Sequence, residues 1–266
     1  MEAYRFAEGA APLLVSAPHV GTDIPADLAN GMTEAALAVP DTDWHIDRLY
    51  DFAAGLGAST IFATQSRTVI DLNRPADGTQ LYPGASNTEL CPLSTFEEQP
   101  IYRAGRGPDK AEIDRRVARV WRPYHDKIAA ELARIKAQRG VALLFDAHSI
   151  KSVLPRFFQG KLPDFNLGSG NGTSCAPELM DRLAAICRGA AGYTTAVNGR
   201  FKGGAITRHF GRPAENIHAV QLELAQSTYM NEAPPFAYRP DLADGVQPVL
   251  KRLLEAMLDW ARMRRA

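Results

Sequence analysis

The chain has 266 residues, of which 45% are hydrophobic, and its 30 basic and 30 acidic residues give a formal net charge of zero. This size and apolar content suffice for a large buried core, and we interpret residues 1–266 as a single domain. The balanced charge and the lack of a long basic run argue against nucleic acid as a partner. No stretch of about 18 apolar residues occurs and the N-terminus lacks an apolar signal region, so we expect a cytoplasmic protein with no membrane partner.

Apolar runs and helical periodicity alternate along the chain. Strands are expected at residues 11–17, 59–64, 68–72, 141–146, 193–197 and 219–224. Helices are expected at 44–56, 111–139, 176–188 and 243–264, with a kink or break at Pro123 in the second of them. This alternation predicts an α/β protein with a mainly parallel or mixed sheet.

Long irregular segments interrupt this pattern. Residues 75–109 contain Pro and Gly throughout, and a loop of this length is more often functional than idle, so it is a candidate lid. A surface excursion without a role is the alternative. Residues 159–174 are expected to form a second loop, and residues 199–211 form a polar, glycine-rich segment.

The three cysteines, Cys91, Cys175 and Cys187, are odd in number and widely spaced. They form neither a disulfide framework nor a CxxC metal-binding pair. We therefore expect three reduced thiols in a reducing compartment.

Two histidines follow apolar runs. His19 comes after the strand expected at 11–17, and His148 comes after the one at 141–146. Ligands bind at the carboxyl ends of strands in open α/β sheets, and a strand end gives an imidazole a defined direction. A lone histidine is more often structural, but two at strand ends indicate a metal site. Asp146, close to the second histidine, is expected to support the site rather than to bind the metal.

A third, acidic ligand is needed, because a hydrolytic zinc site usually has three protein ligands and one open position. Asp47 is our choice, since it lies in the first turns of the helix expected at 44–56. Asp43, Asp23 and His45 are the alternatives. Asp43 has an equally plausible role as a helix N-cap.

Glu223 lies at the end of the strand expected at 219–224. An acidic side chain is unfavourable there unless it is paired or functional. The position suits a general base that takes a proton from water and returns it to a leaving amine. A buried salt bridge is the alternative.

Asn73 and Arg74 follow Asp71 and are predicted to bind a substrate carboxylate. A guanidinium binds a carboxylate through two parallel hydrogen bonds, and an Asn amide can add a third. Arg67 is a further candidate for this role. The alternative is an ion pair between Arg74 and Asp71 or Asp77.

A second group of cations surrounds the Gly203-Gly204 pair in the segment 200–209. Glycines allow backbone amides to approach a ligand closely. Lys202 and Arg208 are therefore predicted to hold a second carboxylate or to stabilise an oxyanion. An ordinary polar loop is the alternative.

Taken together, these motifs resemble the N-formylglutamate amidohydrolase (N-formylglutamate deformylase) family. The resemblance extends from about residue 11 to residue 230. No single motif is specific to the family, but the motifs together are. It is carried by residues 16–21, 43–50, 66–75, 146–149, 201–208 and 221–223.

This resemblance implies hydrolysis of N-formyl-L-glutamate, a small anionic N-acyl amino acid, to formate and L-glutamate in one bacterial route of histidine degradation. It also implies a metal cofactor, zinc or another divalent ion. A more distant similarity to zinc carboxypeptidases and aspartoacylases implies a three-layer α/β/α fold with a mixed, mainly parallel sheet. Those families carry a His-x-x-Glu motif, whereas this chain reads His19-Val20-Gly21-Thr22, so the acidic ligand must come from elsewhere.

Two alternatives to this activity stay open. One is a related zinc deacylase or carboxypeptidase-like amidase that acts on another N-acyl amino acid. The other is an inactive homologue that only binds carboxylates, although a pure binder would not need Glu223 as a base.

Overall fold

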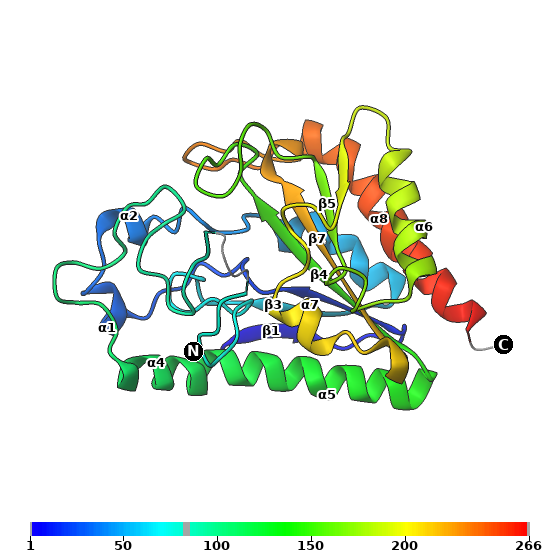
Figure 1. The fold of residues 1–266 in the computed structure, drawn as a ribbon, viewed down its shortest axis with the longest axis horizontal. Helices are drawn as coiled ribbons and strands as arrows, with labels where there is room; N and C mark the ends of the chain where they lie inside the picture. Colours follow the sequence, from blue (N-terminus) through cyan, green and yellow to red (C-terminus); the bar gives the residue numbers. More distant parts are fainter. Residues whose placement is uncertain (1, 82–85, 265–266) are drawn as a thin grey trace.

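Seven strands form one sheet in the computed structural model, which describes residues 2–81 and 86–264 (Figure 1). The strand order is β1-β3-β2-β4-β7-β5-β6. The strands are Tyr4–Ala7 (β1), Leu13–Ala17 (β2), Ser59–Ala63 (β3), Ala142–Ile150 (β4), Phe165–Gly168 (β5), Thr195–Val197 (β6) and Ile217–Ala225 (β7). The pairs β2–β3, β2–β4, β4–β7 and β5–β6 are parallel, whereas β1–β3 and β5–β7 are antiparallel. The prediction of a mixed, mainly parallel sheet is confirmed.

Helices cover both faces of this sheet (Figure 1). Successive side chains of a strand point to opposite faces, so Val15 and Leu14 of β2 lie in two different hydrophobic clusters. The cluster around Val15 includes residues of α6 (Pro177–Arg188) and α8 (Pro240–Met263). The cluster around Leu14 includes residues of α5 (Arg122–Arg139). The chain therefore has the three-layer α/β/α arrangement that we predicted.

The other helices are short. They are α1 (Ala26–Ala29), α2 (Glu34–Leu37), α3 (Ile46–Leu49), α4 (Lys110–Arg116), α7 (Ala205–Phe210), the 3₁₀ helices η1 (Asp51–Leu56), η3 (Pro213–Glu215) and η4 (Gln226–Thr228), and the π-helical turn η2 (Val117–Trp121). In the described part of the chain, no helix is both long enough and apolar enough to cross a membrane. All three cysteines are buried and free, as expected for reduced thiols.

The long helix before β4 has an irregular turn close to the predicted break. Pro123 at the start of α5 has no N–H to donate to the preceding turn, and the wider π-helical turn η2 comes directly before it. At the end of this turn, Trp121 Nε1 donates to the carbonyl oxygen of Arg74 at 2.8 Å, and in α5 His125 Nε2 donates to that of Leu72 at 2.8 Å. The helix therefore holds the segment that carries Asn73.

Some predicted elements differ from the structure. Residues 68–72 form a turn and an irregular stretch rather than a strand, although Val69 and Leu72 are buried as their apolar character indicated. Residues 44–56 form two short helices, α3 and η1, instead of one. Strands β1 and β5 were not predicted, and β5 lies within the loop expected at 159–174. Part of the candidate lid, residues 82–85, lies outside the described residues.

Candidate active site

Parallel strand pairing brings three predicted site residues to one edge of the sheet. Strand β4 lies between β2 and β7 and is parallel to both. His19 follows β2 by two residues. Strand β4 extends past the predicted end, so His148 lies within it and pairs in register with Glu223 of β7. All three side chains are buried.

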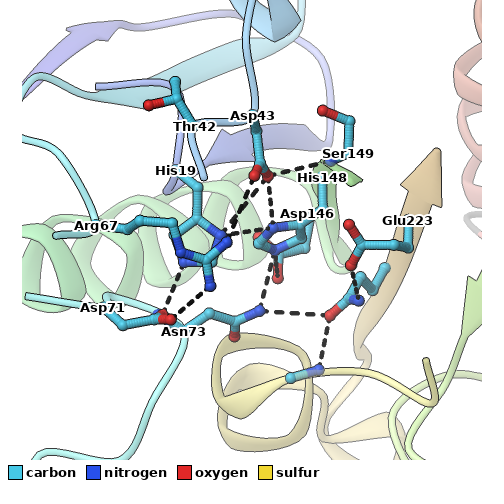
Figure 2. Close-up of polar contacts among 12 residues, drawn as sticks. His19, Thr42, Asp43, Arg67, Asp71, Asn73, Asp146, His148, Ser149 and Glu223 are labelled. Carbon is cyan, nitrogen blue, oxygen red and sulfur yellow. Dashed lines mark hydrogen bonds and ion pairs between the residues drawn. The ribbon is translucent and has the colours of Figure 1, made fainter. Parts of the chain in front are cut away.

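His19, Asp43 and His148 form a compact cluster of metal-ligating groups (Figure 2). His148 Nδ1 lies 3.1 Å from His19 Nδ1 and 3.1 Å from Asp43 Oδ2, and His19 Nδ1 lies 3.6 Å from the same oxygen. A tetrahedral zinc site with bonds of about 2.0–2.1 Å places its donor atoms about 3.3 Å apart. Among the described residues, the buried Oδ1 of Asp43 has no hydrogen-bond partner. These residues therefore fit a divalent metal ion.

In each imidazole, the ring nitrogen that faces away from the cluster is hydrogen-bonded to a carboxylate. His19 Nε2 donates to Asp71 Oδ1 at 2.7 Å, and His148 Nε2 donates to Asp146 Oδ2 at 3.1 Å. With a proton on Nε2, each ring directs the lone pair of Nδ1 toward the cluster. Asp146 therefore supports His148, as predicted.

The acidic surroundings favour a positive charge within this cluster. Burial opposes a charge on His148, but Asp146 and Asp43 outweigh burial and raise the pKa of the imidazole well above its ordinary value. Burial likewise opposes ionisation of Asp43, but His19 and His148 hold the pKa of its carboxyl group below the usual range. The negative charges of Asp146 and Asp43, which favour a proton on His148, would also favour a divalent cation in the cluster.

Asp47, our choice for the acidic ligand, does not join the cluster. Its carboxylate pairs with Arg5 at 2.6 Å, and Asp43 takes the expected acidic position instead. The reason is local, because His45 adopts a left-handed conformation with φ of 62° just before α3 begins. Asp43 precedes this turn, and its N–H donates to the His19 carbonyl at 3.0 Å, whereas Asp47 lies beyond it on the helix.

The other two alternatives for this ligand are also placed elsewhere. Asp23 is exposed and pairs through its backbone with Gln65. His45 donates from Nε2 to the carbonyl oxygen of Phe236 at 2.7 Å.

Glu223 lies beside the cluster, with its carboxyl group close to the Gln221 side chain (Figure 2). Burial raises the pKa of Glu223 to about 8, with the charge of His148 opposing this rise and that of Asp43 adding to it. A carboxyl group with a pKa near neutrality can both accept and release a proton, as acid–base catalysis requires.

A cleft opens next to His19, His148 and Glu223. The side chains that line it carry guanidinium, carboxamide and apolar groups. They include Arg67, Asn73, Arg74, Ile150, Phe157 and Arg200. Three of the predicted substrate-binding residues, Arg67, Asn73 and Arg74, therefore lie together at this cleft.

The guanidinium groups of Arg67 and Arg74 both pair with Asp71 but differ in their other contacts. Arg74 Nη1 lies 3.8 Å from Asp71 Oδ2, which is the ion pair given above as the alternative. Arg67 Nη2 donates to Asp71 Oδ2 at 2.6 Å, so its charge is paired within the protein. Arg74 donates from Nε to the Thr88 carbonyl at 3.1 Å, from Nη2 to the Thr88 hydroxyl at 2.8 Å, and from Nη1 to the Asn73 carbonyl at 3.0 Å. Those contacts use three of the five N–H donors of a guanidinium.

Asn73 is confined between the metal-ligating cluster and the loop before α7. Its Nδ2 lies 3.0 Å from His148 Nε2, and its Oδ1 accepts the N–H of Ile206 at 2.9 Å. The N–H of Gly204 donates to Gln221 Oε1 at 2.7 Å. A Cβ on Gly204 would lie 2.1 Å from Asn73 Nδ2, so only glycine allows this close approach.

The two predicted cations of the 200–209 segment do not line the cleft. Arg208 is exposed on α7 and donates to the Gly203 carbonyl, and Lys202 is not among the described residues that line the cleft. Arg200 lines the cleft instead. The segment has no regular period, so the sequence does not indicate which of its cations lines the cleft.

Comparison with known proteins gives a consistent result. A model of the family described as N-formylglutamate amidohydrolase matches residues 11–230. The chain is 55% identical over 265 residues to an N-formylglutamate deformylase of Pseudomonas aeruginosa, covering 100% of this chain and 99% of the relative. It is 54% identical to a Pseudomonas putida protein of the same name, covering 97% of each. The crystal structure of an N-formylglutamate amidohydrolase from Ralstonia eutropha JMP134 superposes with a TM-score of 0.84 at 29% identity, over 99% of both chains.

The Gly204 contact leads to a prediction about stability. We expect Gly204→Ala to displace Asn73 and to lower the free energy of unfolding by about 1–3 kcal/mol, as overpacking of a tight site does. Gly55→Ala is the matched control, because a Cβ at Gly55 meets no atom within 4 Å, and a change within about 0.5 kcal/mol is expected there. Denaturant unfolding measures both. Equal midpoints for Gly204→Ala and the unsubstituted protein would show that Gly204 does not confine Asn73.

Proposed function

The chain belongs to the N-formylglutamate amidohydrolase family, and we propose that it hydrolyses N-formyl-L-glutamate to formate and L-glutamate. The observation that carries this proposal is one cleft bordered by His19, His148, Glu223 and several guanidinium groups. A cluster that fits a divalent metal ion, a buried acid and cations for carboxylates are the parts that hydrolysis of an anionic formyl amide requires. A place in histidine degradation in the cytoplasm is part of the same proposal.

The proposed metal is zinc, held by Nδ1 of His19, Nδ1 of His148 and a carboxylate oxygen of Asp43. Two imidazoles and one carboxylate are a donor set that hydrolytic zinc sites use. When bound, the metal supplies Lewis acidity that polarises a carbonyl group and acidifies water.

Glu223 is the proposed general base and acid. Its carboxylate takes a proton from the water whose oxygen bonds to the formyl carbon. It then returns that proton to the amide nitrogen as the C–N bond breaks, which releases formate and the amine of L-glutamate. The burial that raises the pKa of Glu223 to about 8 suits it to keep the proton between the two transfers.

Arg74 and Asn73 are the proposed partners of the substrate α-carboxylate. Asn73 contacts His148 and Arg74 follows it directly in the chain, which supports a place for this pair near the metal-ligating cluster. The α-carboxylate is only three bonds from the formyl carbon and must lie near that cluster. The two remaining N–H donors of Arg74, on Nη1 and Nη2, can bind it side by side.

The metal assignment predicts different behaviour for two nearby aspartates. Asp43→Asn should abolish stoichiometric zinc binding, because it removes a charged ligand, whereas Asp47→Asn should bind zinc normally. Elemental analysis of the purified variants measures this. Zinc retained by Asp43→Asn, or lost from Asp47→Asn, would contradict the assignment.

The proton-transfer role of Glu223 predicts that Glu223→Gln keeps zinc but loses turnover. Loss of a general base usually lowers kcat by roughly 10²–10⁴-fold. Formate release by the zinc-loaded variant measures kcat, and the zinc content of the same sample is the control. Turnover close to that of the unsubstituted enzyme would remove Glu223 from the mechanism.

The α-carboxylate assignment predicts the effect of Arg74→Lys, which keeps the charge but loses the planar fork. The variant should lower kcat/KM for N-formyl-L-glutamate by about 1.5–3 kcal/mol in transition-state binding, the range for charged hydrogen bonds. N-formyl-L-glutamine, which keeps the α-carboxylate, should be affected to the same extent. Unchanged kinetics on both substrates would place the α-carboxylate elsewhere.

A further inference from the structure

Gln221 is a buried carboxamide that borders the cleft beside Glu223. It lies two residues before Glu223 on β7, and side chains two residues apart on a strand point to the same face of the sheet. A buried carboxamide needs hydrogen-bond partners for both its oxygen and its nitrogen. The contacts of these two atoms therefore indicate what Gln221 does at the cleft.

The loop before α7 determines which way this amide faces. The N–H of Gly204 lies 2.7 Å from Gln221 Oε1. A backbone N–H can only donate, so the atom that it meets must be the amide oxygen. Asn73 Nδ2, which is a second donor, lies 3.5 Å from the same oxygen. The amide nitrogen of Gln221 must therefore face the other way, toward Glu223.

This nitrogen donates to one oxygen of the Glu223 carboxyl group. Gln221 Nε2 lies 3.4 Å from Glu223 Oε2, and Figure 2 draws the contact as a dashed line at Glu223. The distance is long for a hydrogen bond, but such contacts in enzymes without substrate often shorten when substrate binds. Within residues 2–81 and 86–264, it is the one hydrogen bond that the Glu223 carboxyl group receives.

The contact distinguishes the two oxygens of Glu223. An amide nitrogen can only donate, so Glu223 Oε2 has to accept from it. The carbonyl oxygen of a neutral carboxylic acid is a better acceptor than its hydroxyl oxygen, so the hydrogen bond favours a proton on Oε1. Proton transfer is efficient when the accepting atom is already aimed at its partner.

We propose that Gln221 is a positioning residue for the proton transfers of Glu223. Anchored by the N–H of Gly204, its amide holds Oε2 of Glu223. Oε1 is then the oxygen that takes the proton from water and returns it to the amide nitrogen of the substrate. This inference rests on the proposed function, which supplies the two proton transfers. It gives the loop before α7 a part in the reaction that needs no contact with substrate.

A double-mutant cycle tests whether Gln221 acts through Glu223. Gln221→Met keeps the length of the side chain but removes the donor. It should lower kcat by roughly 10- to 100-fold, as the loss of a group that orients catalytic residues does. In a Glu223→Gln background the same substitution should lower kcat by less than about 3-fold, because the carboxyl group is already gone. An equal loss in both backgrounds would show that Gln221 acts elsewhere.

The KM for N-formyl-L-glutamate separates this role from a structural one. Gln221 also contacts Asn73, a proposed partner of the substrate α-carboxylate. A misdirected Glu223 should lower kcat and change KM by less than about 3-fold, whereas a displaced Asn73 should weaken substrate binding. A raised KM with unchanged kcat in Gln221→Met would therefore contradict the inference.

Gln221→Glu is a second variant, and it keeps the contact with the loop. Its carboxylate can still accept the N–H of Gly204, but it has no nitrogen to donate to Glu223, and two carboxyl groups this close compete for one proton. We expect kcat to fall by at least about 10-fold. A kcat within about 3-fold of the unsubstituted enzyme would show that Gln221 serves only to hold Gly204.

Gln226→Met is the matched control. Gln226 is also a buried carboxamide, and its Nε2 donates to the Thr42 carbonyl at 3.0 Å instead of to Glu223. Any loss of kcat that this substitution causes should be the same with and without Glu223→Gln. If that loss also disappears in the Glu223→Gln background, coupling to Glu223 is not specific to Gln221 and the inference is wrong. Equal zinc content in all variants excludes loss of the metal as the cause.

Crystal structures of the zinc-loaded protein separate this inference from the proposed function. Glu223 Oε2 should lie within hydrogen-bond distance of Gln221 Nε2 in the unsubstituted protein, and the carboxyl group should change direction in Gln221→Met. If the unsubstituted protein releases no formate from N-formyl-L-glutamate but shows this change, the proposed reaction is wrong and the positioning by Gln221 stands. If the carboxyl group keeps its direction in Gln221→Met, Gln221 does not position it.

Discussion

The buried carboxylate of Asp71 is the contact on which the polar site depends. One oxygen accepts His19 Nε2 at 2.7 Å and the Asn73 N–H at 2.9 Å, and the other accepts Arg67 Nη2 at 2.6 Å. Burial alone would favour the neutral acid, but Arg67, Arg74 and His19 together outweigh it and hold the pKa of Asp71 well below its usual range. The resulting anion sets the tautomer of His19, closes the turn before Asn73 and directs Arg67 to the cleft. Without it, Arg67 would be a buried charge lacking its closest partner.

The irregular segment that contains this carboxylate, residues 66–75, accepts hydrogen bonds from the long helix that precedes β4. Residues 66–75 have no strand partners, so their buried carbonyl groups need other donors. Trp121 and His125 provide two of them, at Arg74 and Leu72, from rings stacked with centroids 3.6 Å apart. Burial lowers the pKa of His125 to about 4, so its ring stays neutral and stacks on the indole as an uncharged donor. The π-helical turn before Pro123 thus contributes to the site through the indole of Trp121.

The histidines could be predicted from the sequence because each is tied to an apolar strand, and neighbouring parallel strands end at the same edge of a sheet. The acidic member of the His19–Asp43–His148 cluster could not be predicted in this way. Whether Asp43 or Asp47 faces His19 and His148 depends on one left-handed residue, His45, which is not a glycine and gives no sequence signal for the turn. The strand predicted at 68–72 failed for a related reason. An apolar run indicates that its side chains are buried. Here the buried side chains of residues 68–72 lie in a turn that packs against α5 and not in a strand.

Strands and irregular segments also carry different groups of residues at the cleft. His148 and Glu223 lie on adjacent strands, where the register of β4 and β7 determines their spacing. Arg74 and Arg200 lie on irregular segments, where carbonyl groups of other loops, such as those of Thr88 and Phe157, determine their directions. Strand register survives many loop changes, whereas a guanidinium held by loop carbonyls can be redirected by small local changes. A fold of this kind can therefore keep the register of its central strands while the loops that line the cleft change. For this reason the sheet could be predicted from sequence periodicity, whereas the directions of the arginines that line the cleft could not.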